Sequence, residues 1–163
     1  MKIEKTILNK EVEEISDSMI QFAQKLIQRR SDTGHEKETA DAILEELKKL
    51  DFDEVFRDRT GNVIGILKGD GTEDAILFNC HMDQVDPGDL TAWEYDPFGG
   101  IIADGYIHGR GASDTKGTIA TQIYAAALLK KLEIKLTKDL IFTFVVEEEP
   151  GDMWGAVRMW ADV

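Results

Sequence analysis

A histidine and an aspartate stand two residues apart at the end of an apolar run. The run covers residues 76–78 and continues to His81, and Asp83 follows after one residue. Short apolar runs bounded by polar sequence are typical of buried β-strands, in which residues i and i+2 point to the same side. We therefore expect His81 and Asp83 to project together from the carboxyl end of a strand, where open α/β sheets bind ligands. A strand end with polar residues and no function is equally compatible with this pair.

A second candidate, Asp114, lies in a glycine-rich turn. The turn covers residues 109–117 and does not have the glycine spacing of a P-loop or of a dinucleotide-binding loop. An aspartate just before a helix is also typical of an N-cap, so its position alone assigns no function. The neighbouring Lys116 can face a site at Asp114 or lie in solvent.

Three adjacent glutamates form the third candidate group. Residues 140–146 are almost entirely apolar, which is typical of a central strand covered on both faces, and Glu147, Glu148 and Glu149 follow directly. Neighbouring carboxylates repel one another, and a bound cation relieves that repulsion. An acidic, solvated turn is the alternative interpretation of the triplet.

All three groups lie at strand ends or in the turns that follow, so ligands distant in sequence can converge at one edge of a sheet. Mixed histidine and carboxylate ligands suit zinc, and manganese or cobalt less specifically. A carboxylate such as Asp114 can also bridge two ions about 3.5–4 Å apart, the separation found in two-metal hydrolases. The pattern therefore predicts a divalent-metal site.

Hydrophobic periodicity predicts the elements that position these residues. Apolar residues at helical spacing indicate an amphipathic helix over roughly residues 10–30. A capping box of Thr33 and Glu36 is expected to open a second helix. A third helix should follow Gly117, and another should start near Met153.

The predicted strands surround a long loop. The Asp104-Gly105 pair predicts a type I′ hairpin, in which His108 is a structural residue rather than a ligand. The loop between the strand ending near His81 and this hairpin carries several aromatic residues, and we expect it to wall a pocket. The strand candidates are residues 62–67, 75–79, 101–103, 106–108 and 140–146.

Composition excludes several classes of function. The 163 residues carry 19 basic and 32 acidic side chains, and the formal charge of −13 argues against nucleic acid and anionic membrane surfaces as partners. A single cysteine rules out an intramolecular disulfide and favours a cytoplasmic location. The sequence has no signal-peptide pattern, and no apolar run approaches the roughly 18 residues of a membrane span.

Taken together, the motifs resemble those of the dinuclear zinc exopeptidase and deacylase family. This family includes acetylornithine deacetylase, succinyl-diaminopimelate desuccinylase, aminoacylase and glutamate carboxypeptidase. The resemblance runs in order through residues 81–89, 93–98, 104–117 and 147–151. It implies an α/β fold with a three-layer mixed β-sheet flanked by helices, and identifies residues 1–163 as the N-terminal part of a catalytic domain.

The resemblance implies a role for each candidate ligand. His81 is expected to bind one zinc ion while Asp83 orients its ring. Asp114 is expected to bridge two zinc ions, next to a cis peptide bond with Thr115. Zn²⁺ is the implied cofactor, with two ions per complete site, and Co²⁺ or Mn²⁺ are possible substitutes.

The glutamates complete the implied chemistry. By resemblance, Glu148 is the general base that takes a proton from a zinc-activated water, and Glu149 binds the second zinc. Spacing alone would equally allow Glu147 and Glu148 in these roles. The implied reaction is hydrolysis of the amide bond of an N-acyl amino acid or small peptide.

The family pattern also includes parts that these residues do not supply. They are a further acidic zinc ligand, a lid and dimerisation domain, and a C-terminal histidine. We therefore expect weak zinc binding, little or no amidase activity, exposed apolar surface, and association with a second copy or a missing C-terminal half. The alternative is a non-catalytic protein that keeps a half-site and binds a metal ion or a partner. An unrelated acidic α/β module would leave His81, Asp114 and Glu149 far apart.

Overall fold

The computed structural model describes residues 4–71, 74–151 and 153–161. The helices are α1 (Lys5–Ile27), α2 (Lys37–Lys49), α3 (Gly117–Lys131) and α4 (Trp154–Ala161). The strands are β1 (Glu54–Arg57), β2 (Val63–Leu67), β3 (Ala75–His81), β4 (Ile101–Ala103), β5 (Tyr106–His108) and β6 (Asp139–Val145). Two short helical turns, η1 (Leu90–Ala92) and η2 (Ala112–Lys116), interrupt the loops.

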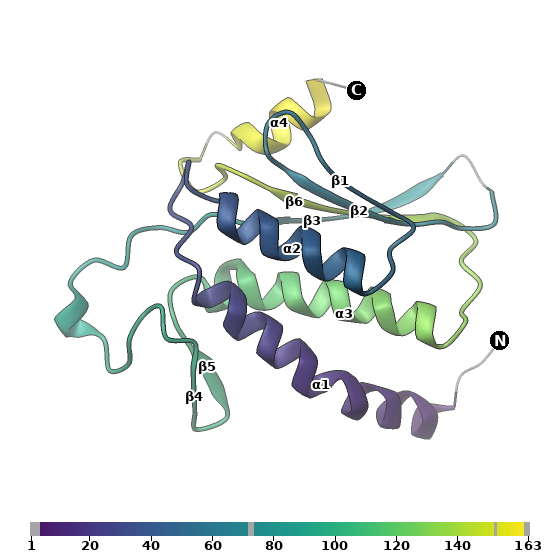
Figure 1. Ribbon diagram of the computed structural model, residues 1–163, viewed down its shortest axis with the longest axis horizontal. Coiled ribbons are helices and arrows are strands. Elements are labelled where there is room, and N and C mark those ends of the chain that lie inside the picture. Colours follow the sequence, from purple (N-terminus) through teal and green to yellow (C-terminus); the bar gives the residue numbers. More distant parts are fainter. Residues whose placement is uncertain (1–3, 72–73, 152, 162–163) are drawn as a thin grey trace.

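Four strands form one mixed sheet in the order β1-β2-β6-β3 (Figure 1). The β1–β2 and β2–β6 pairs are antiparallel, whereas β6 and β3 run parallel. In the parallel pair His81 lies opposite Val145. Parallel strands in this register end at the same edge of the sheet, so the residues that follow β3 and β6 emerge side by side.

Helices pack against one face of this sheet, and one short helix lies on its other side. Helices α2 and α3 pack against one face, α1 packs on α3 as an outer layer, and α4 lies on the opposite side of the sheet (Figure 1). No helix among the described residues is long and apolar enough to cross a bilayer. The prediction of an α/β fold with a mixed sheet between helices is confirmed.

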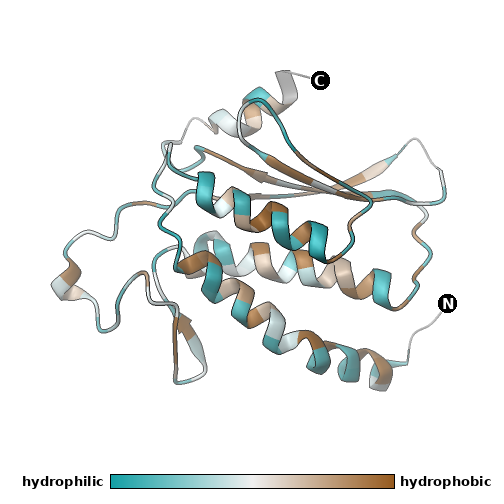
Figure 2. Cartoon of the chain, in the orientation of Figure 1, coloured by the Kyte–Doolittle hydropathy of each residue, from teal (hydrophilic) through white to brown (hydrophobic). Residues whose placement is uncertain are grey.

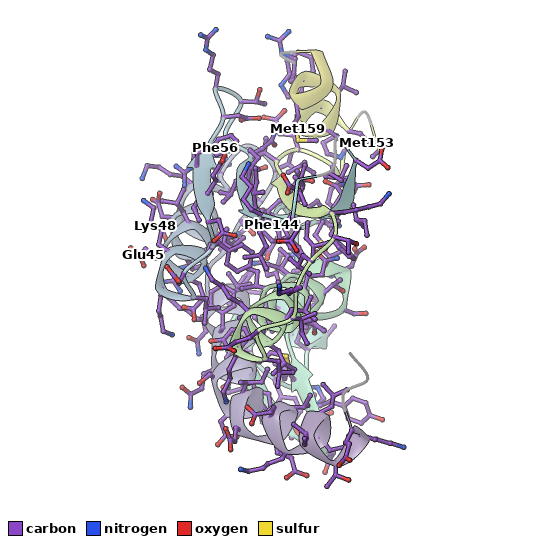
Figure 3. The ribbon with its side chains drawn as sticks, turned by 90° about the vertical axis from the view of Figure 1, so that its right-hand side faces the viewer. Glu45, Lys48, Phe56, Phe144, Met153 and Met159 are labelled. Atoms are coloured by element: carbon purple, nitrogen blue, oxygen red, sulfur yellow. The ribbon has the colours of Figure 1, made fainter. Side chains whose placement is uncertain are left out.

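Amphipathic patterning explains how the helices pack. In α2 the residues Ala40, Ile43 and Leu47 are buried, at the i, i+3 and i+7 spacing of one helix face. Glu45 and Lys48 of the same helix point to solvent, whereas Phe144 of β6 lies in the interior (Figure 3). In Figure 2 the sheet strands are mainly hydrophobic, and the helices alternate between hydrophobic and hydrophilic residues.

Strand β3 departs from the prediction of a buried strand. Its first five residues are exposed, and only Cys80 and His81 are buried. Ile76, Leu77 and Phe78 have exposed fractions of 46%, 40% and 36%. Within the described residues β3 pairs only with β6, so its outer edge has no neighbour. An apolar run therefore predicted the strand correctly but not its place at the edge of the sheet.

The hairpin of β4 and β5 matches its prediction. Asp104 and Gly105 both have positive φ, 50° and 81°, as a type I′ turn requires. The ring of His108 lies against Tyr95, with ring centroids 4.6 Å apart, so His108 has the structural role expected.

The long loop before the hairpin is held by cationic side chains. The Arg110 guanidinium lies 5.1 Å from the ring centre of Trp93, and Arg30 lies 5.4 Å from that of Phe98. Trp93 also lines a cavity of about 520 Å³ with Tyr106 and other residues of the hairpin. Trp93 is the one loop residue in the lining of this pocket, and the lining does not include His81, Asp114 or Glu149, so the expectation that the aromatic residues of the loop wall a functional pocket stays a prediction.

Candidate metal centre

Three predicted ligands meet at the carboxyl edge of the sheet. One ligand atom from each of His81, Asp114 and Glu149 lies within 4.8 Å of the others. His81 ends β3 and Glu149 follows β6, so the parallel pairing of these strands brings the two together. The hydroxyl of Thr115 donates to the backbone carbonyl of His81 at 2.9 Å and ties the turn η2 to the same strand. Side chains from three segments that are distant in sequence thus lie together. The alternative hypothesis of an unrelated acidic α/β module predicts that they lie far apart.

Asp114 does not cap a helix. It lies inside η2, its peptide bond to Thr115 is cis, and Lys116 occupies the N-cap position of α3. Its side chain is 72% exposed, and Oδ1 lies 2.9 Å from Nε2 of His81. The N-cap interpretation is therefore wrong, and the carboxylate is free to face a ligand beside His81.

The imidazole of His81 is held from both sides. Nδ1 lies 3.0 Å from the backbone carbonyl of Asp83 and 3.5 Å from its Oδ1, while Nε2 faces Asp114. Burial lowers the pKa of His81, but hydrogen bonds to Asp83 and Asp114 outweigh it and raise the pKa to about 9. The surroundings of Nε2 therefore favour positive charge.

Asp83 holds more than the histidine ring. Its carboxylate is fully buried and accepts the backbone N–H groups of Glu148 and Glu149, each at 3.0 Å, and the hydroxyl of Thr33 at 2.9 Å. Burial raises the pKa of Asp83, and the bonds from His81 and from these donors lower it to about 2. The carboxylate is thus a fixed anion that anchors the acidic turn.

The acidic turn crowds carboxylates around the histidine. Oε2 of Glu148 lies 3.9 Å from Nε2 of His81. The pKa of Glu149 is raised by burial and by the negative charges of Asp114, Asp83 and Glu148, with His81 acting in the opposite direction. A cation among these groups would remove that repulsion.

Two residues of the loop before α2 belong to this network and were assigned another role from the sequence. Thr33 and Glu36 do not form a capping box, because α2 begins at Lys37 with Glu36 itself in the N-cap position, and the Thr33 hydroxyl donates to Asp83. Oε1 of Glu36 accepts the N–H groups of Gly34 at 2.9 Å and Glu147 at 3.1 Å. Glu36 and Glu147 are 111 positions apart, so no local pattern predicts their contact.

Lys116 lies neither in solvent nor among the acidic groups. Its side chain is fully buried, and Nζ donates to the backbone carbonyl of Arg29 at 2.7 Å and to Oε1 of Gln84 at 2.5 Å. Burial lowers its pKa to about 7. Lys116 therefore fastens the turn that carries Asp114 to the end of α1 and to the loop after β3.

The donor set fits a divalent cation. An imidazole nitrogen with carboxylate oxygens is a ligand combination that zinc accepts, and manganese or cobalt less specifically. Burial is the main cause of the raised pKa of Glu149, and the negative charges of Asp114, Asp83 and Glu148 add to it. Glu148 adds a further carboxylate beside these donors, with Oε2 3.9 Å from Nε2 of His81. A cluster of metal-binding donors with an additional carboxylate beside it is typical of a metallohydrolase centre.

Comparison with known proteins agrees with this class. The family model described as peptidase family M20/M25/M40 matches residues 77–163, and the chain belongs to this family. The chain is 39% identical over 146 residues to succinyl-diaminopimelate desuccinylase of Blochmanniella pennsylvanica, covering 87% of this chain and 38% of that protein. It is 34% identical over 154 residues to N-formyl-4-amino-5-aminomethyl-2-methylpyrimidine deformylase of Bacillus subtilis, covering 89% and 36%.

Solved structures show the same fold. Human carnosine dipeptidase 1 superimposes with a TM-score of 0.77 at 23% sequence identity, over 90% of this chain and 36% of that one. The chain thus spans between 36% and 38% of the length of these relatives.

Proposed function

We propose that this chain carries part of the catalytic centre of a metal-dependent hydrolase that cleaves an amide bond in an N-acyl amino acid or small peptide. The observation that carries the proposal is the convergence of His81, Asp114 and Glu149 within 4.8 Å. Two relatives above 30% identity are named for removing a succinyl or a formyl group, which supports an acylated amine as the substrate class.

The proposed metal ligands are His81, Asp114 and Glu149. Zinc is the ion that this donor set favours, with Co²⁺ or Mn²⁺ as substitutes, and Asp114 is the carboxylate that two ions would share. When bound, such an ion polarises a carbonyl group and lowers the pKa of water from 15.7 toward about 7.

The remaining side chains supply proton transfer and orientation. Glu148 is half-buried and lies beside the ligand cluster, so we assign to it the general base that accepts a proton from the attacking water and passes it to the leaving amine. Asp83 accepts a hydrogen bond from the backbone N–H of Glu148 and so fixes the position of the residue that carries this base. The ring of His81 is kept in place by the backbone carbonyl of Asp83.

Metal titration of the purified chain tests the ligand assignment. Isothermal titration calorimetry with Co²⁺ or Zn²⁺ should show binding that weakens on the order of 10-fold or more in each of His81→Ala, Asp114→Ala and Glu149→Ala. His108→Ala is the matched control, because His108 packs against Tyr95 in the hairpin and should leave binding unchanged. Binding that survives all three ligand substitutions would refute the assignment.

Turnover is the second test. The described residues offer three ligands at the focus, whereas zinc takes about four per ion, so we expect weak binding and little turnover from these 163 residues. The assay measures amine released from N-succinyl and N-formyl amino acids in the presence of Zn²⁺ or Co²⁺. Robust turnover would contradict the expectation of low activity while supporting the reaction class.

A further inference from the structure

Three consecutive backbone amides of the acidic turn are bound by two buried carboxylates. The N–H of Glu147 donates to Oε1 of Glu36 at 3.1 Å. The N–H groups of Glu148 and Glu149 donate to the two oxygens of Asp83, each at 3.0 Å. The exposed fractions of Glu36 and Asp83 are 5% and 0%. The backbone of the turn is therefore held by two carboxylates of the protein interior.

The first residue of this turn has the least favourable backbone. Glu147 has φ of +53°, in the left-handed region that residues other than glycine rarely adopt. Such a conformation persists where surrounding contacts determine it. The carboxylate of Glu36 makes the contact to the amide of this residue, one position before the proposed base.

Glu36 is itself fixed by its own loop. The same Oε1 accepts the N–H of Gly34 at 2.9 Å, and Thr33 of this loop donates to Asp83. The loop before α2 thus supports both carboxylates that hold the turn. The contacts of Glu36 are to backbone amides, so any effect on the metal centre passes through the position of the turn.

We propose that Glu36 is a positioning residue of the metal centre. By binding the amide of Glu147 it sets the backbone from which Glu148 and Glu149 project toward His81. The link to metal binding rests on the function proposed above, whereas the hold on Glu147 is independent of it. Groups that support metal ligands in this indirect way typically alter metal affinity about 10–100-fold when removed.

Two substitutions separate this role from a purely structural one. Glu36→Leu keeps the approximate volume and removes the acceptor, whereas Glu36→Gln keeps an acceptor oxygen. Glu46→Leu is the matched control, because Glu46 of α2 is equally buried at 5% and accepts from Tyr124 at 2.8 Å, in contact with α3 rather than the turn. Two measurements are made on each full chain: Co²⁺ affinity with its visible absorption spectrum, and hydrogen exchange of the Glu147 amide by NMR.

We expect Glu36→Leu to weaken Co²⁺ binding on the order of 10-fold, to change the Co²⁺ spectrum, and to accelerate exchange at Glu147. Glu36→Gln should stay close to the wild type in both measurements. Glu46→Leu should lower the melting temperature while leaving Co²⁺ binding and hydrogen exchange at Glu147 unchanged.

Several results would overturn the proposal. One such result is a Glu36→Leu chain with a lower melting temperature but the Co²⁺ affinity and Co²⁺ spectrum of the wild type. Glu36 would then have a structural role only, at any rate of hydrogen exchange at the Glu147 amide. If Glu36→Leu does not fold, Glu36→Asp is measured in its place, because the shorter aspartate side chain withdraws the carboxylate from Glu147. Wild-type Co²⁺ binding and wild-type hydrogen exchange in Glu36→Asp would contradict the proposal. If the wild-type chain binds no Co²⁺, the proposed metal centre is refuted. Hydrogen exchange at the Glu147 amide then tests by itself whether Glu36 holds the backbone of the turn.

Discussion

Replacing Asp83 with asparagine tests how one buried carboxylate supports the acidic turn. Both of its oxygens accept backbone N–H groups, from Glu148 and from Glu149. Asparagine keeps the volume and one carbonyl oxygen, but it puts an NH₂ donor in place of the other oxygen. Either orientation of the amide therefore leaves one backbone donor facing another donor.

The expected loss can be obtained in two ways. A hydrogen bond to a charged acceptor contributes about 1.5–3 kcal/mol, and a buried donor without a partner costs about 1–3 kcal/mol. The pKa of Asp83 in the folded chain is about 2, against an ordinary value of 3.8, and at about 1.4 kcal/mol per pH unit this difference corresponds to about 2–3 kcal/mol. We expect Asp83→Asn to lower the free energy of unfolding by about 2–3 kcal/mol near neutral pH.

The pH dependence of this loss has a definite sign. Because the pKa of Asp83 is lower in the folded chain than in the unfolded chain, its contribution is fully present above 3.8 and is lost as the pH falls through about 2. Urea unfolding of the wild type and of Asp83→Asn should therefore show a free-energy gap that narrows below about pH 4. The gap should also shrink as the pH rises from about 6.5 to about 9, because Asp83 raises the pKa of His81 in the folded chain and the stability from that shift is lost as His81 deprotonates. Asp17→Asn, at an exposed position of α1, should show no comparable gap.

A wild-type free energy of unfolding in Asp83→Asn, within about 0.5 kcal/mol, would refute this account of the turn. A gap of the expected size that does not change with pH would also refute it, because the stabilisation would then not come from an ionised carboxylate.

Three further outcomes are expected. Glu148→Gln should retain Co²⁺ binding in calorimetry, while any hydrolysis of N-acyl amino acids falls about 100-fold or more, and unchanged hydrolysis would exclude Glu148 as the base. Lys116→Met should change how the free energy of unfolding in urea depends on pH. Because burial lowers the pKa of Lys116 from 10.5 to about 7, the wild type should gain stability relative to the variant as the pH rises from about 7 to about 10, and a difference that does not change with pH would contradict this. Burial raises the pKa of the Cys80 thiol, so a disulfide reagent should label it slowly in the native chain and rapidly in urea, and fast native labelling would show that the strand end opens.

Features set by nearby residues could be predicted from the sequence. The apolar face of α2 and the positive φ angles of Asp104 and Gly105 depend on residues a few positions apart, and both were predicted correctly. Strand β1 was missed because four residues with charged ends, Glu54 and Arg57, give too short a pattern. The edge position of β3 was also missed, because periodicity reports which residues are apolar and not which strands pair.

In the candidate site, too, features that depend on nearby residues could be predicted from the sequence, and contacts between distant segments could not. His81, Asp114 and Glu149 could be named because each lies in a short motif next to a strand or a turn. The supporting contacts could not be named, because they join segments far apart in the chain, as between Glu36 and Glu147. Thr33 shows how a local rule fails here, since its hydroxyl donates to a buried carboxylate 50 positions away and does not accept a backbone N–H of the helix that follows.

The conformation of the acidic turn explains why the protein places so much negative charge in one region. Backbone N–H groups that leave a sheet must find acceptors, and carboxylates accept those of Glu147, Glu148 and Glu149. Glu36 and Asp83 therefore add buried charge beneath a surface that already carries Asp114, Glu148 and Glu149. The negative charges of Asp114, Asp83 and Glu148 add to the effect of burial in raising the pKa of Glu149. Support of the turn and attraction for cations thus have the same physical origin, because the anions that fix the backbone also create the field that a divalent ion neutralises.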